Sequence, residues 1–449
     1  MNVPLRVRRR AKASGAVTPR RRRPARRLLG SATAVLVVLA LLVVGYSQHR
    51  ASPSVDAFYD PPNSVAQSRT AQAAALDRPG RLLRAEPFTR GIPQTARAWR
   101  ILYTTTRADN SPAVASAIVL LGKHAPAGRH PVLAWAHGTS GYAEACAPSL
   151  FTQPFGSGIR QELGEVIRRH WVLVATDYTG MGTKGPQPYL IGQSEGRAML
   201  DAVRATRQLR QVSASNRTVV WGLSQGGGAA LWTGQIQRAY APDVPLVGVA
   251  AIAPTSDMPA IAAHMNAVRG GMVFMAYIMT AYTAAYPDVH MDDYVSPAHR
   301  KLVRAASERC LTAANLVVRN AASTRTGPLL KRSPLTGPLG QRLRENTPTG
   351  VGTTPLLVAQ GGSDSLILPA VQRGFVKGLC DNGQRLDYRE YPGRNHGGVA
   401  RGNSPFLPQL ITWTEHRWAG DATPDNCPRL THARPTHGKP TRTADLRKS

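Results

Sequence analysis

The chain has 449 residues and a formal net charge of +30, because 56 Lys and Arg stand against only 26 Asp and Glu. Much of this excess is terminal: residues 1–27 carry eleven basic residues and no acid, and residues 429–449 carry six basic residues and one acid. The remaining 39 basic and 25 acidic residues give residues 28–428 a net charge of +14. No nucleic-acid-binding motif accompanies this charge, which argues against a nucleic-acid-binding protein. This charge indicates an arginine-rich surface or attraction to anionic lipids or envelope polymers. The tail 429–449 is predicted to be disordered.

The amino terminus predicts export. Leu28 to Tyr46 is an uncharged run of nineteen residues, long enough at about 1.5 Å per residue to span most of a bilayer core. It exceeds the usual apolar region of a signal peptide, and no A-x-A cleavage site follows it. We therefore predict a transmembrane signal anchor at 28–46, with a cleaved signal peptide as the alternative, and a linker at 47–55. The positive-inside rule places residues 1–27 in the cytoplasm and the rest outside.

Short apolar runs alternate with helical patterns from about residue 56 to residue 428. Residues 98–105 and 115–121 flank a turn sequence at 109–112 and predict a hairpin. An amphipathic helix is expected at 194–212 and a last strand at 386–391. Further strands are expected at 131–136, 171–176, 218–221, 247–252 and 355–359. The alternation predicts an α/β fold with a mostly parallel central sheet flanked by helices.

The strand 218–221 leads into Gly222-Leu223-Ser224-Gln225-Gly226, and small residues that begin a helix follow. Strand, G-x-S-x-G and helix together predict a nucleophile elbow, in which Ser224 adopts a strained backbone conformation at a tight turn. Gly222 and Gly226 are expected there because a Cβ would clash. The elbow makes Ser224 the candidate nucleophile and the backbone N–H of Gln225 a candidate oxyanion donor.

The second oxyanion donor is expected in the loop after the strand 131–136. This loop starts with His137, Gly138 and Thr139, and a glycine there lets the backbone approach a developing oxyanion. The N–H of Gly138 or of Thr139 is the candidate, and His137 is expected to shape the loop rather than act as a base.

Residues 255–347 interrupt the alternation and predict a helical cap. Six of the nine methionines lie there, which suits either a surface that adapts to acyl chains or the buried core of the cap.

The other two members of a catalytic triad should follow the serine in the order acid, then histidine. Asp364 lies in a small-residue turn just after the strand 355–359, where a parallel sheet presents side chains at its carboxyl edge. The competing role for Asp364 is a helix N-cap near Pro369. His396 lies in the loop after the last strand, whereas His416 has a helical pattern around it. We predict that His396 is the base and that Asp364 orients it.

Four cysteines in a chain that is predicted to be exported indicate disulfides, for which three pairings are possible. No pair has C-x-x-C spacing, which argues against zinc and against a redox motif.

Taken together, these motifs resemble the secretory lipases of the α/β-hydrolase superfamily, the group of Candida antarctica lipase A and actinobacterial exported lipases. The resemblance covers roughly residues 56–428. Besides the elbow and the segments around Asp364 and His396, it rests on Phe58 to Pro62, Trp135 to Thr139, Cys146 to Ser149, Asp177 to Gly182, Tyr189 to Gly192 and Glu195 to Arg197. It implies hydrolysis of carboxylic esters such as triacylglycerols, without a metal or organic cofactor. It also implies the disulfides Cys146–Cys310 and Cys380–Cys427.

Three classes of function fit this sequence. An exported lipase or short-chain carboxylesterase acting through Ser224 is our first interpretation. A peptidase or amidase would use the same triad, and a noncatalytic binding protein would not need the triad to be intact.

Overall fold

The computed structural model describes residues 55–61, 78–156, 158–267, 271–311 and 328–431. Contacts group residues 52–449 into one compact unit, apart from residues 1–51. The predicted anchor at 28–46, most of the linker and most of the basic tail lie outside the described residues. Within the described part of the chain, no helix has the length and apolar character needed to cross a bilayer.

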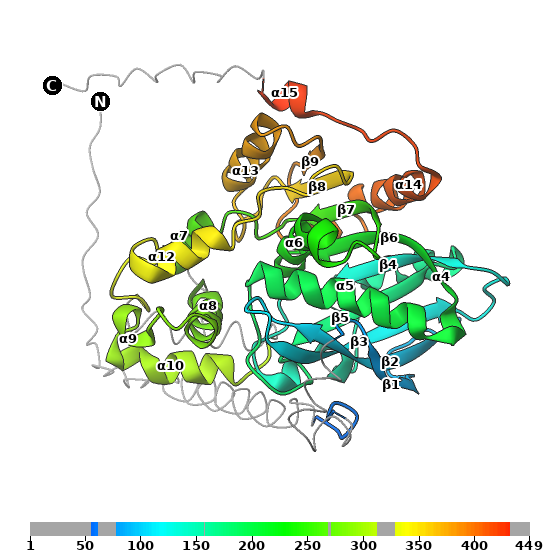
Figure 1. The fold of residues 1–449 in the computed structure, drawn as a ribbon. Coiled ribbons are helices and arrows are strands. Elements are labelled where there is room, and N and C mark those ends of the chain that lie inside the picture. Colours follow the sequence, from blue (N-terminus) through cyan, green and yellow to red (C-terminus); the bar gives the residue numbers. More distant parts are fainter. Residues whose placement is uncertain (1–54, 62–77, 157, 268–270, 312–327, 432–449) are drawn as a thin grey trace, which may run out of the picture. The chain divides into compact units, whose positions relative to one another are not determined.

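Nine strands form one mixed, mostly parallel sheet in the order β1-β2-β3-β5-β4-β6-β7-β8-β9 (Figure 1). The neighbours from β1 to β5 in this order are antiparallel, and those from β5 to β9 are parallel. The strands are β1 (Leu82–Pro87), β2 (Ala96–Thr106), β3 (Pro112–Gly122), β4 (His130–Ala136), β5 (Val172–Thr179), β6 (Ala214–Leu223), β7 (Leu246–Ile252), β8 (Leu356–Gly361) and β9 (Asp387–Tyr391).

Helices cover both faces of this sheet. The described helices are α4 (Leu163–Arg168), α5 (Gly192–Gln208), α6 (Gln225–Tyr240), α7 (Met258–Ala267), α8 (Gly271–Ala285), α9 (Met291–Tyr294), α10 (Pro297–Ser307), α12 (Gly337–Glu345), α13 (Pro369–Asp381), α14 (Phe406–Ala419) and α15 (Cys427–Thr431). Helices α5, α6 and α13 contribute to one hydrophobic core, and α4 and α14 to another. Successive residues of a strand serve opposite cores, as Ala134 and Trp135 of β4 do.

The segment between β7 and β8 contains helices α7 to α10 and α12, and no strand of the sheet begins among its described residues. We call it the helical insertion. A third hydrophobic core packs its helices, α8 above all, against Tyr189, Leu190, Ile191 and Ile367 of the body. Four of its six methionines, Met258, Met265, Met275 and Met279, are fully or almost fully buried. Packing within the insertion therefore accounts for most of the methionine enrichment.

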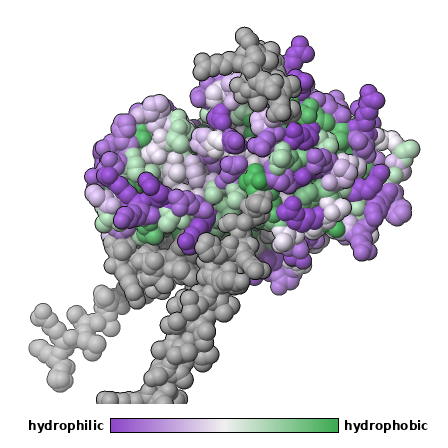
Figure 2. Space-filling model, turned by 90° about the horizontal axis from the view of Figure 1, so that it is seen from below, coloured by the Kyte–Doolittle hydropathy of each residue, from purple (hydrophilic) through white to green (hydrophobic). Residues whose placement is uncertain are grey.

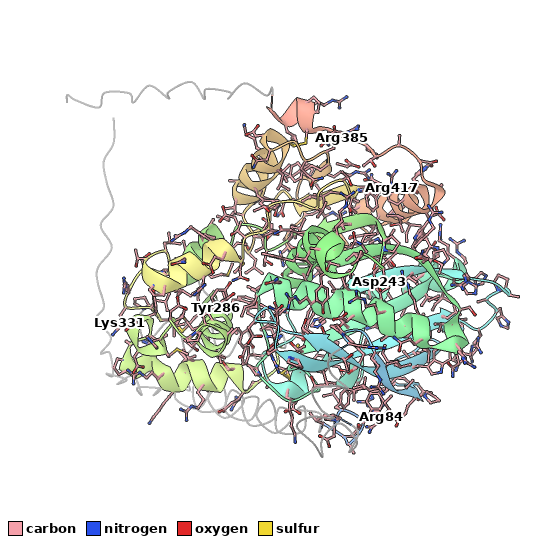
Figure 3. All side chains as sticks on the ribbon, viewed as in Figure 1. Arg84, Asp243, Tyr286, Lys331, Arg385 and Arg417 are labelled. Carbon is pink, nitrogen blue, oxygen red and sulfur yellow. A yellow bond between two sulfur atoms is a disulfide. The ribbon has the colours of Figure 1, made fainter. Side chains whose placement is uncertain are left out.

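The surface is mainly polar. On the face in Figure 2, hydrophobic residues are scattered among hydrophilic ones, and Leu335 is the large hydrophobic side chain that is exposed in the described part of the chain. The labelled cations in Figure 3 come from separate elements: Arg84 from β1, Lys331 from the insertion, Arg385 from the turn before β9 and Arg417 from α14. Arg385 forms an ion pair with Asp425.

Candidate active site

Ser224 lies between β6 and α6 in a strained conformation, with φ 59° and ψ −119°. Its carbonyl accepts hydrogen bonds from the N–H groups of Gly228 and Thr255, both at 3.1 Å. A Cβ on Gly222 would lie 1.9 Å from the carbonyl oxygen of Gly226, and a Cβ on Gly226 would lie 2.0 Å from that of Ala136. Glycine is therefore required on both sides of the serine for the turn to form.

Asp364 and His396 follow the neighbouring parallel strands β8 and β9, so both lie at the carboxyl edge of the sheet. The Nδ1 of His396 is 2.8 Å from Oδ2 of Asp364. The side chain of Asp364 is fully buried, and that of His396 is 21% exposed. The Oδ1 of Asp364 accepts the N–H groups of Leu366 and Ile367, both at 2.9 Å. These bonds fix the carboxylate within its own turn.

The structure also shows where the alternatives to these two assignments lie, namely the N-cap of α13 and the second histidine. The N-cap of α13 is Leu368, so Asp364 does not cap that helix. His416 lies on α14, exposed, and hydrogen-bonds to Asp421. Two other carboxyls that lie between Asp364 and His396 in the sequence, those of Asp387 and Glu390 within β9, form ion pairs with Arg389 and Arg373.

The loop after β4 lies beside the elbow because β4 and β6 are parallel neighbours, with Ala136 paired to Gly222. His137 is buried, and its Nδ1–H donates to the carbonyl of Gly138 at 2.7 Å. Burial lowers the pKa of His137 to about 4, so this imidazole is neutral at physiological pH. This matches the expected structural role of His137.

The hydroxyl of Thr139 shares a hydrogen bond of 3.0 Å with that of Tyr189. Among the described residues, no backbone or side-chain acceptor takes the N–H of Gly138, Thr139 or Gln225. Each of these N–H groups therefore lacks a partner in the described part of the chain, as an oxyanion donor must before a ligand binds.

Ser224, His396, Gly138 and Thr139 line one open cavity of about 480 Å³. A second, apolar pocket of about 20 Å³ touches Ser224 from the side of the insertion, and its walls include Ile261, Met265, Phe274, Ile278 and Leu366. Phe274 and Leu366 line both spaces, so they lie between the open cavity and the inner pocket.

Glu195 of α5 is a site residue that the sequence does not single out, apart from its place among the residues of the family resemblance. Its side chain is buried, and its Oε1 accepts the Nε2–H of Gln225 at 2.7 Å and the N–H of Leu190 at 3.1 Å. Burial raises the pKa of Glu195 to about 8. A glutamate in an amphipathic helix is usually exposed, and sequence gives no sign that this one faces the elbow.

The structure joins Cys146 to Cys310 and Cys380 to Cys427, the pairs that the family resemblance implies. The first disulfide connects the segment after Gly138 to the insertion. Gly141 also pairs with Cys310 in a β-bridge, and Leu311 donates its N–H to Ser140 at 2.7 Å. The second disulfide connects α13 to α15.

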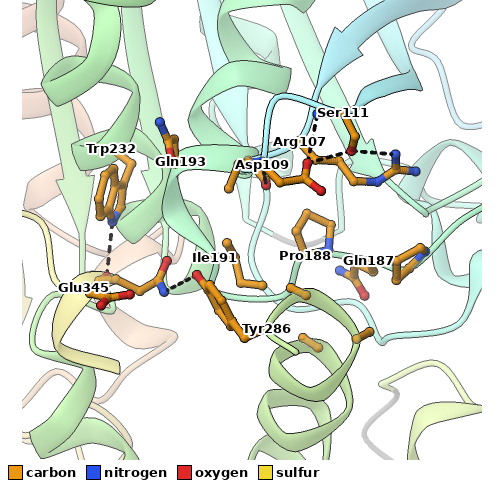
Figure 4. A pocket seen from close by; sticks show the side chains of 17 residues that line it. Arg107, Asp109, Ser111, Gln187, Pro188, Ile191, Gln193, Trp232, Tyr286 and Glu345 are labelled. Carbon is orange, nitrogen blue, oxygen red and sulfur yellow. Dashed lines mark hydrogen bonds between the residues drawn. The ribbon is translucent and has the colours of Figure 1, made fainter. Parts of the chain in front are cut away.

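A separate cavity of about 590 Å³ lies between the body and the insertion (Figure 4). Its walls include Asp109 and Ser111 from the turn between β2 and β3, Trp232 of α6, and Tyr286 and Glu345 of the insertion. The side chains of Ser224, Asp364 and His396 are not among its walls.

Comparison with known proteins gives a family and a fold. The family model described as secretory lipase matches residues 162–426. Similar sequences include a probable inactive lipase of Mycobacterium tuberculosis, 25% identical over 401 residues (84% of this chain and 85% of the relative). A secreted triacylglycerol lipase of Malassezia globosa is 24% identical over 432 residues, which are 84% of each chain.

Two solved structures show the same arrangement of the sheet and its helices. Candida antarctica lipase A has a TM-score of 0.65 at 16% identity, over 84% of this chain and 88% of that one. The rice cell wall degrading esterase LipA of Xanthomonas oryzae has a TM-score of 0.62 at 19% identity, over 77% and 100%. The fold is thus α/β-hydrolase-like, and because the family model spans more than half of its residues, the chain belongs to the secretory lipase family.

Proposed function

We propose that this protein is an exported serine hydrolase that cleaves carboxylic esters through a triad of Ser224, His396 and Asp364. One observation carries the proposal: the hydrogen bond of 2.8 Å between His396 Nδ1 and Asp364 Oδ2, beside a cavity that both His396 and the strained Ser224 line. Because Nδ1 is engaged by the carboxylate, the Nε2 of His396 is left to accept a proton from the serine.

The mechanism has two steps. Ser224 Oγ attacks the ester carbonyl carbon while its proton passes to Nε2 of His396, and Asp364 stabilises the imidazolium. The N–H of Gln225, with that of Gly138 or Thr139, stabilises the oxyanion of the tetrahedral intermediate. His396 then returns the proton to the leaving alcohol, and the acyl group stays on Ser224. Water, deprotonated by His396, releases the acid and regenerates the serine.

The substrate is an ester with an apolar acyl group, because the inner pocket beside Ser224 is lined by aliphatic and aromatic side chains. Family membership and the triacylglycerol lipases among the relatives favour a lipase. The volume of the inner pocket, about 20 Å³, favours a short-chain carboxylesterase instead, because this space holds little more than one water-sized group.

The location we propose is extracytoplasmic. Two disulfides persist in oxidising compartments, and the family is one of secretory lipases. The apolar run at 28–46 would then hold the enzyme at the outer face of the cell membrane.

The test compares the oxidised protein with its Ser224→Ala variant on p-nitrophenyl esters of increasing chain length and on an emulsified triacylglycerol. Serine-dependent cleavage of the long chains and the triacylglycerol would support a lipase, and cleavage of short chains alone a carboxylesterase. Serine-dependent cleavage of anilides but no esters would mean an amidase. An absence of serine-dependent turnover would refute the triad.

We expect Ser224→Ala and His396→Ala each to lower kcat by several orders of magnitude, and the double variant to lower it little further. Residues that act as one unit are strongly non-additive, since either loss already disables the shared step. Steady-state kinetics of the three variants, with circular dichroism to verify folding, would check this. Multiplying losses in the double variant would contradict a joint role.

A further inference from the structure

Glu195 lies behind the elbow without a counter-charge. In the parts of the chain that the structure describes, no Lys, Arg or His forms an ion pair with it. Burial has the largest influence on the pKa of its carboxyl. The titratable side chains whose pKa its charge would raise are those of Tyr178, Tyr189 and Tyr282. An ionised carboxylate buried among uncharged groups is costly, which favours the neutral acid.

The partner of Glu195 points to the same state. The Nε2–H of Gln225 donates to Glu195 Oε1 at 2.7 Å, but the buried Oε1 of Gln225 has no donor among the described residues. A proton on Oε2 of Glu195 would supply that missing donor. The carboxylic acid and the amide would then form a pair with two hydrogen bonds, and both buried groups would be satisfied.

Glu195 also connects the two sides of the candidate oxyanion site. Its Oε1 accepts the N–H of Leu190, a residue with a φ of 57°. The carbonyl of Leu190 accepts the hydroxyl of Tyr282 at 3.1 Å, and the preceding Tyr189 holds Thr139 by its hydroxyl. One carboxyl thus holds both Gln225, next to the nucleophile, and the turn that holds Thr139.

We propose that Glu195 is a positioning residue, kept as a neutral acid, that aligns the oxyanion donors of Gln225 and Thr139. It touches neither substrate nor nucleophile, and the proposal rests on the proposed function of Ser224. Charging of Glu195 at alkaline pH would break the pair with Gln225 Oε1 and release the alignment.

The test uses Glu195→Gln and Glu195→Leu, with kcat and KM measured from neutral to alkaline pH on a p-nitrophenyl ester. Glutamine keeps one acceptor and one donor, as the neutral acid does, so it should retain kcat to within about threefold. Leucine keeps the volume but no polar atom, and we expect kcat to fall by about tenfold to a hundredfold with KM little changed. Above about pH 8, kcat of the wild type should decline, whereas that of Glu195→Gln should not.

Asp201→Asn is the matched control. Asp201 is a buried carboxyl on the same helix, but it hydrogen-bonds to Thr105, Tyr240 and Arg204. Its variant reports what a buried polar change in α5 does to stability, and the alkaline decline of kcat should remain. If Glu195→Leu does not fold, the pH profile of Glu195→Gln still decides.

Each of three outcomes would overturn the inference. The first is a wild-type kcat in Glu195→Leu, and the second is a loss of kcat in Glu195→Gln as large as that in Glu195→Leu. The third is identical pH profiles of kcat for the wild type and Glu195→Gln. In these cases serine-dependent turnover and labelling of Ser224 by a fluorophosphonate would persist, so the proposed function would stand. If the wild type showed neither turnover nor labelling, the proposed function and the role of Glu195 would fall together.

Discussion

Two glycines give Ser224 its geometry, since the α-carbons of Gly222 and Gly226 lie against carbonyl oxygens of neighbouring segments. The positive φ of Ser224 is a cost that the surrounding hydrogen bonds hold in place. Backbone shape, rather than the serine alone, therefore makes this position suitable for a nucleophile.

Gly222→Ala should lower the free energy of unfolding by about 3 kcal/mol or more, because overpacking here meets backbone rather than a movable side chain. Gly374→Ala in α13 is the control, since nothing lies within 4 Å of its added Cβ. It should raise the free energy of unfolding by about 0.5–1 kcal/mol, as alanine is the better helix former. Denaturant unfolding measures both, and equal effects of the two substitutions would contradict this account of the elbow.

The pH dependence of stability should report the proton on Glu195. The pKa of its carboxyl rises from 4.5 to about 8 on burial, so between these values the native state holds a proton that the unfolded state lacks. Stability from this group is therefore full below about 4.5 and is lost as pH rises toward about 8. The Tm of Glu195→Gln relative to wild type should increase through this window and then level off.

The Tm of the Asp201→Asn control relative to the wild type should change over a narrower pH range, because the pKa of Asp201 rises only from 3.8 to about 6. Thermal unfolding of the three proteins at a series of pH values gives the comparison. A Tm difference for Glu195→Gln that is flat across the window would mean that Glu195 is ionised in the native state.

Residue-scale prediction from sequence succeeds where a motif constrains the backbone. G-x-S-x-G after an apolar strand predicts the elbow at Ser224, and the position of His396 after β9 follows from the topology. Glu195 could not be found in this way, because the groups that surround it come from Gln225 and the turn at Leu190, and no local pattern joins them.

At the scale of elements, strands with continuous apolar runs were predicted well, and so was the edge strand β9, expected at 386–391, whereas β1 at the other edge was not. The predictions at 131–136, 247–252 and 355–359 fall on β4, β7 and β8, and no end differs by more than two residues. β1 was missed because it is an edge strand with half-exposed side chains. β5 continues to Thr179, beyond the predicted end at 176, because buried Asp177 is satisfied by hydrogen bonds from Ser116 and Ser149.

The helix expected at 194–212 begins two residues earlier and ends at Gln208, followed by a 3-10 turn at Arg210–Val212. Ser213 then adopts a left-handed conformation, which stops the helical path before β6. The apolar spacing continues through Leu209 and Val212, which are both buried, so the pattern alone overestimates the length of the helix.

The two disulfides should separate stability from activity. Replacing both Cys146 and Cys310 by serine should lower the free energy of unfolding by about 2–4 kcal/mol and kcat by about tenfold or more, because the loop that carries Thr139 loses its attachment. Replacing Cys380 and Cys427 should also lower stability but leave kcat unchanged, since α13 and α15 lie outside the cavity walls.

The separations of 164 and 47 residues predict that the first disulfide stabilises more, by about 1 kcal/mol. Denaturant unfolding and kinetics on one ester test both parts. Equal losses of kcat in the two double variants would show that the Cys146–Cys310 bond has no special relation to the site.

On the scale of the whole molecule, residues 52–449 form one compact unit by their contacts, and residues 1–51 are not part of it. A protein starting at Ser52 should therefore unfold at the same temperature as the full chain and have the same kcat. The full chain should remain with the membrane after alkaline carbonate extraction, because the apolar run at 28–46 would span it, whereas the shorter chain should be soluble. Release of the full chain by carbonate would refute the anchor.

Among the described residues, the attachments of the helical insertion to the body include the peptide chain after β7, the Cys146–Cys310 disulfide and Asn346. The side-chain oxygen of Asn346 accepts the N–H of Gly192 at 3.1 Å, and its backbone carbonyl accepts the Nε1–H of Trp232 at 3.2 Å. A rigid body held at two points can still rotate about the line between them, but a third attachment removes that axis. The disulfide and these hydrogen bonds therefore oppose a swing of the insertion away from the body as one piece. Entry of a long acyl chain into the inner pocket should then depend on rotamer changes of side chains such as Phe274 more than on a hinge motion of the insertion.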